Sequence, residues 1–224
     1  MVRYAITSRA LYPGNELQRQ TSLLREASRW IAEGIDFIQL REKDLPAASI
    51  AALARQILRM IAAANSPTKL LINSRPDIAI ATAAHGVHLT GSADELIAAQ
   101  IRGLYASAKR PAPIITVSCH TLEDIHRARV HGVDAILFAP VFEKIVDGKD
   151  SDGQIVTAGQ GLNQLRAACL AASPIPVYAL GGVTLENART CIEAGTVGIA
   201  GIRLFHQCQF DACRAPSSVL EVRQ

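Results

Sequence analysis

Short apolar stretches alternate along the chain with longer stretches of helical periodicity. Between residues 16 and 33, apolar side chains such as Leu23, Ala27 and Trp30 recur every three or four residues, which places them on one face of a helix. Gly34 follows at the position of a helix C-cap, and the apolar run 37–40 is typical of a strand. This part of the chain therefore predicts a helix followed by a short strand.

The same alternation repeats to the end of the chain. We predict strands at residues 3–7, 37–40, 70–73, 86–89, 114–117, 135–138, 177–180 and 198–200. We predict helices at residues 16–33, 47–64, 75–83, 93–108, 122–131, 161–172, 184–194 and 203–212. Strands joined by helices run parallel, and eight such units in 224 residues favour an α/β fold, a closed (β/α)8 or TIM barrel. No G-x-G-x-x-G turn follows the first strand, which weakens the alternative of an open doubly wound sheet.

The barrel is expected to take up the whole chain, residues 1–224, as a single domain. Residues 214–224 carry weak signals, and we expect this tail to fray. The segment 139–160 is polar and is predicted to be a structureless loop; it contains Lys144 and Lys149. A loop of that length in a compact domain is uncommon and is usually functional.

Composition and charge exclude several classes of function. The net charge of +3 comes without any basic run, so we expect no nucleic-acid surface. No apolar run reaches the ~18 residues of a membrane span, and the N-terminus lacks a signal-peptide pattern, so we expect a cytoplasmic protein without membrane contact. The five cysteines are scattered and form no C-x-x-C pair, which argues against disulfides and zinc.

Candidate chemistry gathers where the predicted strands end, which is where (β/α)8 barrels build their active sites. Gln39, Arg41 and Lys43 alternate along the end of the second strand, so an extended backbone places them on one face. Two cations and an amide together suit an anion, although a solvated strand end is the simpler alternative. The position at the rim favours anion binding.

Other strand ends add polar groups. Gly181, Gly182 and Arg203 follow the seventh and eighth strands, where barrels often bind phosphate through backbone N–H groups. The alternative is that the glycines only permit tight turns. Asn73 suits either a ligand contact or an Asx turn. His88 lies within a strand, so we interpret it as a hydrogen-bonded core residue.

Several short motifs occur in the order found in thiamine phosphate synthases. They are Tyr4-Ala5-Ile6-Thr7, Ile38-Gln39-Leu40-Arg41-Glu42-Lys43, Leu71-Ile72-Asn73, Gly86-Val87-His88-Leu89, Ser118-Cys119-His120, Ala139-Pro140-Val141-Phe142, Gly161-Leu162 and Ala179-Leu180-Gly181-Gly182-Val183-Thr184. Together they run from about residue 3 to residue 205, in register with the predicted strand ends. The chain thus resembles the superfamily that holds thiamine phosphate synthase and the related thiazole tautomerase.

The resemblance implies a (β/α)8 transferase that joins 4-amino-2-methyl-5-(diphosphooxymethyl)pyrimidine to a thiazole phosphate and releases diphosphate. It implies a dissociative step, in which Mg²⁺ and fixed cations neutralise the leaving group. The implied contacts of the pyrimidine and its diphosphate are Gln39, Arg41, Lys43, Asn73 and Ser118. Those of the thiazole phosphate are Gly181, Gly182 and the backbone around Ile202 and Arg203. The expected catalytic residues are Arg41, Lys43, Ser118 and Lys144.

Some positions depart from the family pattern. Ser74 stands where the family has an aspartate that binds Mg²⁺, and a hydroxyl is a weaker ligand for a hard cation. Asp94, displaced by one residue, is the other expected metal ligand. The threonines of the sixth loop are missing, and either Lys144 or Lys149 takes the place of the family lysine. Arg203 replaces a small hydroxyl residue beside the thiazole phosphate.

Three functions are compatible with this pattern. The first, which we favour, is the synthase. The second is a tautomerase-like enzyme; that family carries a histidine where this chain has Pro140, which cannot transfer a proton. The third is a barrel that binds a phosphorylated thiazole or thiamine ligand without turnover. In each case the partners are small phosphorylated molecules, and the sequence leaves a homo-oligomer open.

Overall fold

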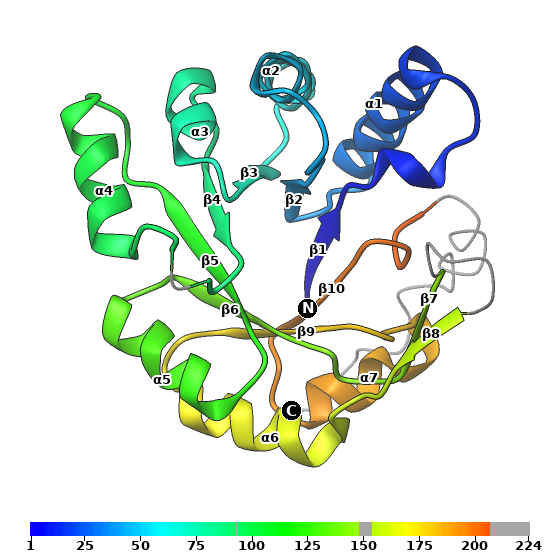
Figure 1. The fold of residues 1–224 in the computed structure, drawn as a ribbon, viewed down its shortest axis with the longest axis vertical. Helices are drawn as coiled ribbons and strands as arrows, with labels where there is room; N and C mark the ends of the chain where they lie inside the picture. The colour runs from blue at the N-terminus through cyan, green and yellow to red at the C-terminus, as the bar shows by residue number, and fades with distance from the viewer. Residues whose placement is uncertain (93, 148–153, 207–224) are drawn as a thin grey trace, which may run out of the picture.

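The strands form a closed barrel. The computed structural model describes residues 1–92, 94–147 and 154–206, with the backbone alone for 144–147 and 154–156. Within these ranges, eight parallel strands close in the order β1-β10-β9-β6-β5-β4-β3-β2 (Figure 1). Their bounds are β1 Val2–Ile6, β2 Phe37–Leu40, β3 Lys69–Asn73, β4 Gly86–Leu89, β5 Ile114–Cys119, β6 Ala135–Phe138, β9 Val177–Leu180 and β10 Gly198–Gly201. The prediction of a (β/α)8 barrel is confirmed.

Helices connect the strands and lie around the outside of the barrel (Figure 1). Their bounds are α1 Glu16–Ala32, α2 Ala47–Ala63, α3 Pro76–Thr82, α4 Ala98–Ser107, α5 Leu122–His131, α6 Gly161–Ala172 and α7 Leu185–Glu193, with a short 3-10 helix η1 at Arg9–Leu11. Most predicted bounds are right to within one or two residues. The helix predicted from residue 93 begins only at Ala98, because the Glu95 carboxylate accepts the N–H groups of Thr90 and Gly91 and holds a turn there.

Two apolar layers sandwich the strands, since successive side chains of a strand point to opposite faces. Ile38, Ile72 and Ile136 belong to the layer that packs against the helices. Tyr4 and Leu137 belong to the layer that fills the barrel interior. A filled interior leaves the loops at the rim as the place for a site.

The loop after β9 is fixed by the cap of α7. Thr184 Oγ1 accepts the N–H of Asn187 at 3.3 Å, and Asn187 Oδ1 accepts the N–H of Thr184 at 2.8 Å, which is a reciprocal capping box. Asn187 Nδ2 also donates to the carbonyl of Gly182 at 3.0 Å. The cap therefore ties the loop that contains Gly181 and Gly182 to α7.

The segment 139–160 contains regular structure, contrary to the prediction of a structureless loop. β7 (Lys144–Asp147) and β8 (Gln154–Thr157) pair antiparallel, with Lys144 opposite Thr157. Two short pairs of β-branched residues, Ile145-Val146 and Ile155-Val156, face each other in this ladder. The polar residues around these pairs hid their strand character in the sequence.

The predicted last helix does not begin at Arg203. Residues 203–206 form a turn, in which the N–H of His206 donates to the carbonyl of Arg203 at 3.1 Å. The Phe205 carbonyl accepts from Arg29 Nη2 at 2.6 Å and Trp30 Nε1 at 2.7 Å, so side chains of α1 take the place of a helical hydrogen bond. The rest of that helix and the tail 214–224 lie outside the described residues. In the described ranges, no helix has the length and apolar character needed to cross a membrane.

Candidate active site

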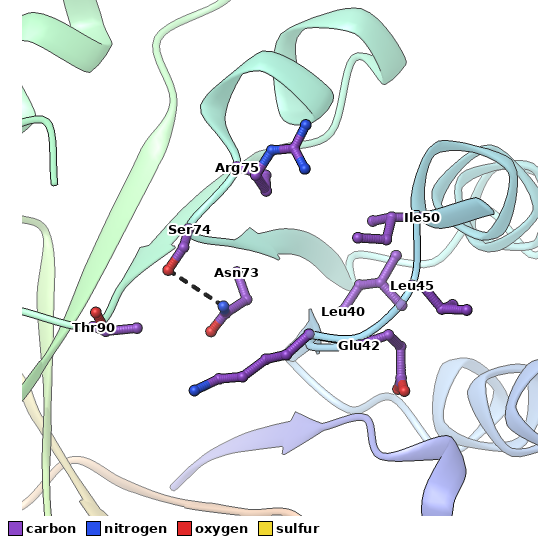
Figure 2. Close-up of a pocket in the computed structure, with 9 residues that line it drawn as sticks. Leu40, Glu42, Leu45, Ile50, Asn73, Ser74, Arg75 and Thr90 are labelled. Atoms are coloured by element: carbon purple, nitrogen blue, oxygen red, sulfur yellow. Dashed lines mark hydrogen bonds between the residues drawn. The ribbon is translucent and has the colours of Figure 1, made fainter. Parts of the chain in front are cut away.

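A cavity of about 250 Å³ opens where β2 and β3 end (Figure 2). Its lining consists of Leu40, Glu42, Lys43, Leu45, Ile50, Asn73, Ser74, Arg75 and Thr90. Three predicted site residues, Lys43, Asn73 and Ser74, therefore meet at one cavity. Arg75 adds a cation that was not among the predicted site residues, and its guanidinium pairs with Asp77 at 2.6 Å.

The three residues predicted to share a face of β2 separate, because the strand ends at Leu40. Gln39 is 1% exposed, and its Nε2 donates to the Tyr4 hydroxyl at 3.1 Å inside the barrel. Arg41 is half-buried, and its N–H donates to Thr7 Oγ1 at 2.9 Å. Lys43 is exposed and lines the cavity. The predicted alternation holds only as far as the strand does.

Ser74 occupies a left-handed backbone conformation at the end of β3, with φ of 53°. A positive φ is uncommon outside glycine and marks a residue held by its surroundings. The N–H of Ser74 donates to the His88 carbonyl at 2.8 Å, and its hydroxyl donates to Glu95 Oε1 at 2.6 Å. Asn73 Nδ2 donates to Ser74 Oγ at 3.3 Å (Figure 2). These bonds fix the turn that presents Asn73 to the cavity.

Glu95 belongs to the site, although the sequence did not single it out. Its Oε1 accepts from Ser74, and its Oε2 accepts the N–H groups of Thr90 at 2.7 Å and Gly91 at 3.0 Å. One carboxylate therefore joins the ends of β3 and β4. Asp94, the predicted metal ligand, is exposed. The only hint in the sequence was that two acids stand side by side after β4.

The Glu95 carboxylate at these strand ends is engaged by protein hydrogen bonds rather than presented to a Mg²⁺. Magnesium ions require near-octahedral oxygen ligands, commonly one or two carboxylates together with substrate phosphates. Both oxygens of Glu95 accept hydrogen bonds from the protein, and the Ser74 hydroxyl donates to one of them. No group of three or more acids, histidines or cysteines suited to a metal occurs among the residues described. A Mg²⁺ site at Ser74 and Asp94 stays a prediction.

A chain of four hydrogen bonds crosses the barrel interior from Gln39 to Ser118. Gln39 contacts the Tyr4 hydroxyl at 3.1 Å, and Tyr4 contacts Thr116 Oγ1 at 3.2 Å. Thr116 Oγ1 lies 2.8 Å from His88 Nδ1, and His88 Nε2 lies 3.0 Å from Ser118 Oγ. The interpretation of His88 as a hydrogen-bonded core residue is confirmed. The chain also links two residues that were predicted to bind substrate.

The buried Gln39 end of this chain determines which group donates in each of its hydrogen bonds. Because Gln39 donates to Tyr4, the proton of the Tyr4 hydroxyl goes to Thr116, and Thr116 donates to His88 Nδ1. The reverse direction would leave the buried Tyr4 proton without an acceptor, which is costly. Burial and the charge of Arg41 lower the pKa of His88 to about 3, so the ring is neutral. His88 thus donates from Nε2 to Ser118 and leaves the Ser118 proton for a ligand.

The glycine loop after β9 has a packing reason for its composition. Gly181 and Gly182 have φ of 90° and 65°. A Cβ would lie 2.8 Å from Pro140 Cα at Gly181 and 2.4 Å from the Glu143 carbonyl oxygen at Gly182. The tight-turn alternative is thus supported, and phosphate binding by this loop stays a prediction.

The remaining predicted residues lie at other strand ends. Ile202 is half-buried and Arg203 is exposed after β10, which neighbours β9 in the barrel and so places both beside the glycine loop. Lys144 opens β7, where only the backbone is described, and Lys149 lies outside the described residues. Which lysine faces the site is therefore left to experiment.

Parallel strands closed into a barrel, with polar side chains at their C-terminal ends, define the class of (β/α)8 enzymes. Residues 4–205 match the family model described as thiamine monophosphate synthase, and the chain belongs to this family. It is a transferase of thiamine biosynthesis, as the motifs predicted.

Individual relatives agree with the family match. The thiamine-phosphate synthase of Roseiflexus castenholzii is 34% identical over 169 residues, which cover 75% of this chain and 68% of the relative. The thiamine-phosphate synthase of Shouchella clausii is 31% identical over 199 residues, covering 89% and 85%. The solved structure of thiamine phosphate pyrophosphorylase from Pyrococcus furiosus matches with a TM-score of 0.69 and 25% identity, covering 90% of this chain and 85% of that one.

Proposed function

We propose that the protein joins an aminopyrimidine methyl diphosphate to a thiazole phosphate, which yields thiamine phosphate and diphosphate. Membership of the synthase family supports the reaction. The cavity at the ends of β2 and β3 supports the position of the diphosphate. A cytoplasmic location and a homo-oligomer stay predictions.

The observation that carries the proposal is the cation at the cavity, Lys43, with Arg41 close by on the same segment. In the dissociative step, the C–O bond breaks and its electron pair leaves with the diphosphate. The thiazole nitrogen then donates its lone pair to the pyrimidine methyl cation. Fixed cations that face the leaving oxygens lower the barrier because charge develops there. We assign this role to Arg41 and Lys43.

Ser118 and Asn73 supply polar contacts to the pyrimidine half of the reaction. The neutral His88 ring donates to Ser118 Oγ, so the Ser118 hydroxyl is oriented as a donor to substrate. Asn73 is held at the cavity by Ser74. Gln39 acts through the hydrogen-bond chain that ends at Ser118, since its side chain is buried.

The thiazole phosphate is assigned to the other side of the rim. Gly181, Gly182, Ile202 and Arg203 lie at the ends of the adjacent strands β9 and β10. Backbone N–H groups in such loops suit a phosphate. Lys144 or Lys149 is assigned to the same reaction as the loop cation.

Mg²⁺ is not given a step in this proposal. A bound Mg²⁺ would supply further neutralisation of the diphosphate. Because the carboxylate of Glu95 is engaged by three protein donors, we assign the neutralisation to Arg41 and Lys43. The Mg²⁺ dependence of turnover then reports how much of that charge the protein itself provides.

A direct assay tests the proposal. Purified protein is mixed with both substrates over a series of Mg²⁺ concentrations that includes a chelator, and thiamine phosphate and diphosphate are quantified. We expect the two products in equal amounts. Absence of thiamine phosphate at every Mg²⁺ concentration would contradict the proposal, and tight binding of thiazole phosphate without product would favour the non-catalytic binding barrel.

A further inference from the structure

Arg9 lies in η1, after β1, and binds the segment that carries the two rim cations. The residue is 7% exposed. Its Nη1 donates to Glu42 Oε2 at 3.1 Å and to Asp44 Oδ1 at 2.7 Å, and its Nη2 donates to Asp44 Oδ2 at 2.7 Å. Its backbone N–H lies 3.2 Å from both oxygens of Glu42. Nε donates to Glu16 of α1 at 2.7 Å, so one guanidinium pairs with three carboxylates.

The charges of residues 41–44 alternate in sequence, as Arg41, Glu42, Lys43 and Asp44. Glu42 lines the same cavity as Lys43. Its carboxylate nevertheless points away from Asn73 (Figure 2) and accepts a hydrogen bond from the Arg9 guanidinium. Both acids of this segment therefore pair with Arg9. Arg41 and Lys43, the two cations of the segment, take no part in this pairing.

Asp44 carries a negative charge at neutral pH. Hydrogen bonds from Arg9 are the main reason that the pKa of Asp44 is lowered to about 2. Glu42 is buried and accepts from the Arg9 guanidinium and backbone. An anionic ligand in the cavity would meet the Glu42 carboxylate, which lines it, and would lie near that of Asp44 on the same segment, if nothing compensated them.

We propose that Arg9 is a positioning residue for the leaving diphosphate, because it sequesters Glu42 and Asp44 and so leaves Arg41 and Lys43 to the anion. The proposal rests on the proposed function, since diphosphate is the anion concerned. Loss of Arg9 has two consequences that act in the same direction. Two uncompensated carboxylates repel the ligand, and they also compete with it for the rim cations.

The third partner of Arg9 provides a matched control. Glu16 lies on α1 and lines no part of the cavity, and its side chain is 48% exposed. Glu16→Gln removes one ion pair of Arg9 while the contacts to Glu42 and Asp44 stay. If the network were purely structural, loss of the Arg9–Glu16 contact would matter as much as loss of the contacts to Glu42 and Asp44. The proposed role concerns only Glu42 and Asp44, which we call the rim acids.

The experiment measures binding of inorganic diphosphate by titration calorimetry and the kinetics with both substrates. We expect Arg9→Met to raise the Kd for diphosphate about tenfold or more. We expect the KM for the pyrimidine diphosphate to rise similarly, while Glu16→Gln changes both by less than about twofold. Folded Arg9→Met that binds diphosphate as the wild type does would overturn the proposal.

Two further variants separate charge from folding. Arg9→Met/Glu42→Gln/Asp44→Asn removes the two carboxylates of the segment after β2 together with Arg9, and we expect diphosphate affinity within about threefold of the wild type; affinity as low as that of Arg9→Met would refute the sequestering role. Arg9→Lys covers the case in which Arg9→Met does not fold. A lysine ammonium lacks the planar set of donors with which the guanidinium binds both rim acids, so we expect about fivefold weaker binding of diphosphate. Unchanged binding would overturn the proposal.

The outcome also distinguishes this proposal from the assigned reaction. Wild-type protein that binds diphosphate more tightly than Arg9→Met but forms no thiamine phosphate would overturn the reaction and leave the role of Arg9 standing. Wild-type and Arg9→Met proteins that bind diphosphate equally, with thiamine phosphate formed, would overturn the role of Arg9 and leave the reaction standing.

Discussion

His88 shows how a single buried residue sets the chemistry at the rim. Its ring is 3% exposed and accepts from Thr116 while it donates to Ser118. This arrangement requires a neutral ring with its proton on Nε2. Burial provides that state by lowering the pKa to about 3. In this arrangement Ser118 Oγ accepts from the His88 ring, so the Ser118 hydroxyl proton is not used in that hydrogen bond.

The depressed pKa of His88 predicts how stability depends on pH. Between the ordinary value of 6.5 and about 3, the unfolded chain binds a proton at this histidine that the folded chain does not. Stability is therefore greatest above pH 6.5 and falls as the pH drops through this window. Denaturant unfolding of wild type and His88→Gln should show this, with the wild type losing up to about 1.4 kcal/mol more per pH unit.

His126 offers the control for this measurement, because it is an exposed histidine of α5. His126→Gln shows how the loss of a histidine at an exposed position affects the same measurement. Parallel curves for wild type and His88→Gln would contradict the buried neutral ring.

At the scale of elements, the site depends on ties between neighbouring strand ends. Glu95 joins β3 to β4 through Ser74, Thr90 and Gly91. Arg9 joins η1 to the segment after β2 in a comparable way. Loops in (β/α)8 barrels carry the functional groups, and ties of this kind hold them in position.

Loss of the Glu95 charge should loosen the ends of β3 and β4. Glu95→Gln replaces one carboxylate oxygen by an amide donor that cannot accept from Ser74 or from the backbone N–H groups. We expect the free energy of unfolding to fall by about 1–3 kcal/mol, measured by denaturant titration. Asp94→Asn, at the exposed neighbouring position, should change it by less than about 0.5 kcal/mol. Equal losses of unfolding free energy in the two variants would contradict the role of Glu95 in holding the ends of β3 and β4 together.

The same pair of variants addresses the predicted Mg²⁺ site. If Asp94 were a metal ligand, Asp94→Asn would raise the Mg²⁺ concentration needed for turnover. An unchanged Mg²⁺ requirement would contradict Asp94 as a ligand.

At the scale of the whole molecule, local patterns predicted the barrel and its order well. Strands such as Phe37–Leu40 and Gly86–Leu89 were predicted with the observed bounds, because apolar runs and flanking turn residues are local signals. The hairpin of β7 and β8 was missed, because polar residues surround its two pairs of β-branched residues and no apolar run stands out.

The ties within the site were less accessible to sequence reasoning. Arg9 lies 35 residues from Asp44, and Ser74 lies 21 residues from Glu95. No local period connects such pairs, and only closure of the barrel brings them together. The predicted trio of Gln39, Arg41 and Lys43 does not share a single face, because the alternation of an extended backbone was carried past Leu40, where the strand ends.

The account as a whole depends on the cationic segment after β2 binding the leaving diphosphate. The most direct test is the kcat/KM for the pyrimidine diphosphate in Arg41→Ala, at saturating thiazole phosphate. Arg59→Ala, an exposed arginine of α2, serves as the control. We expect the kcat/KM of Arg41→Ala to fall about a hundredfold or more, because one preorganised charge is removed from the transition state. We expect the kcat/KM of Arg59→Ala to match that of the wild type. A kcat/KM for Arg41→Ala equal to that of the control would contradict the account.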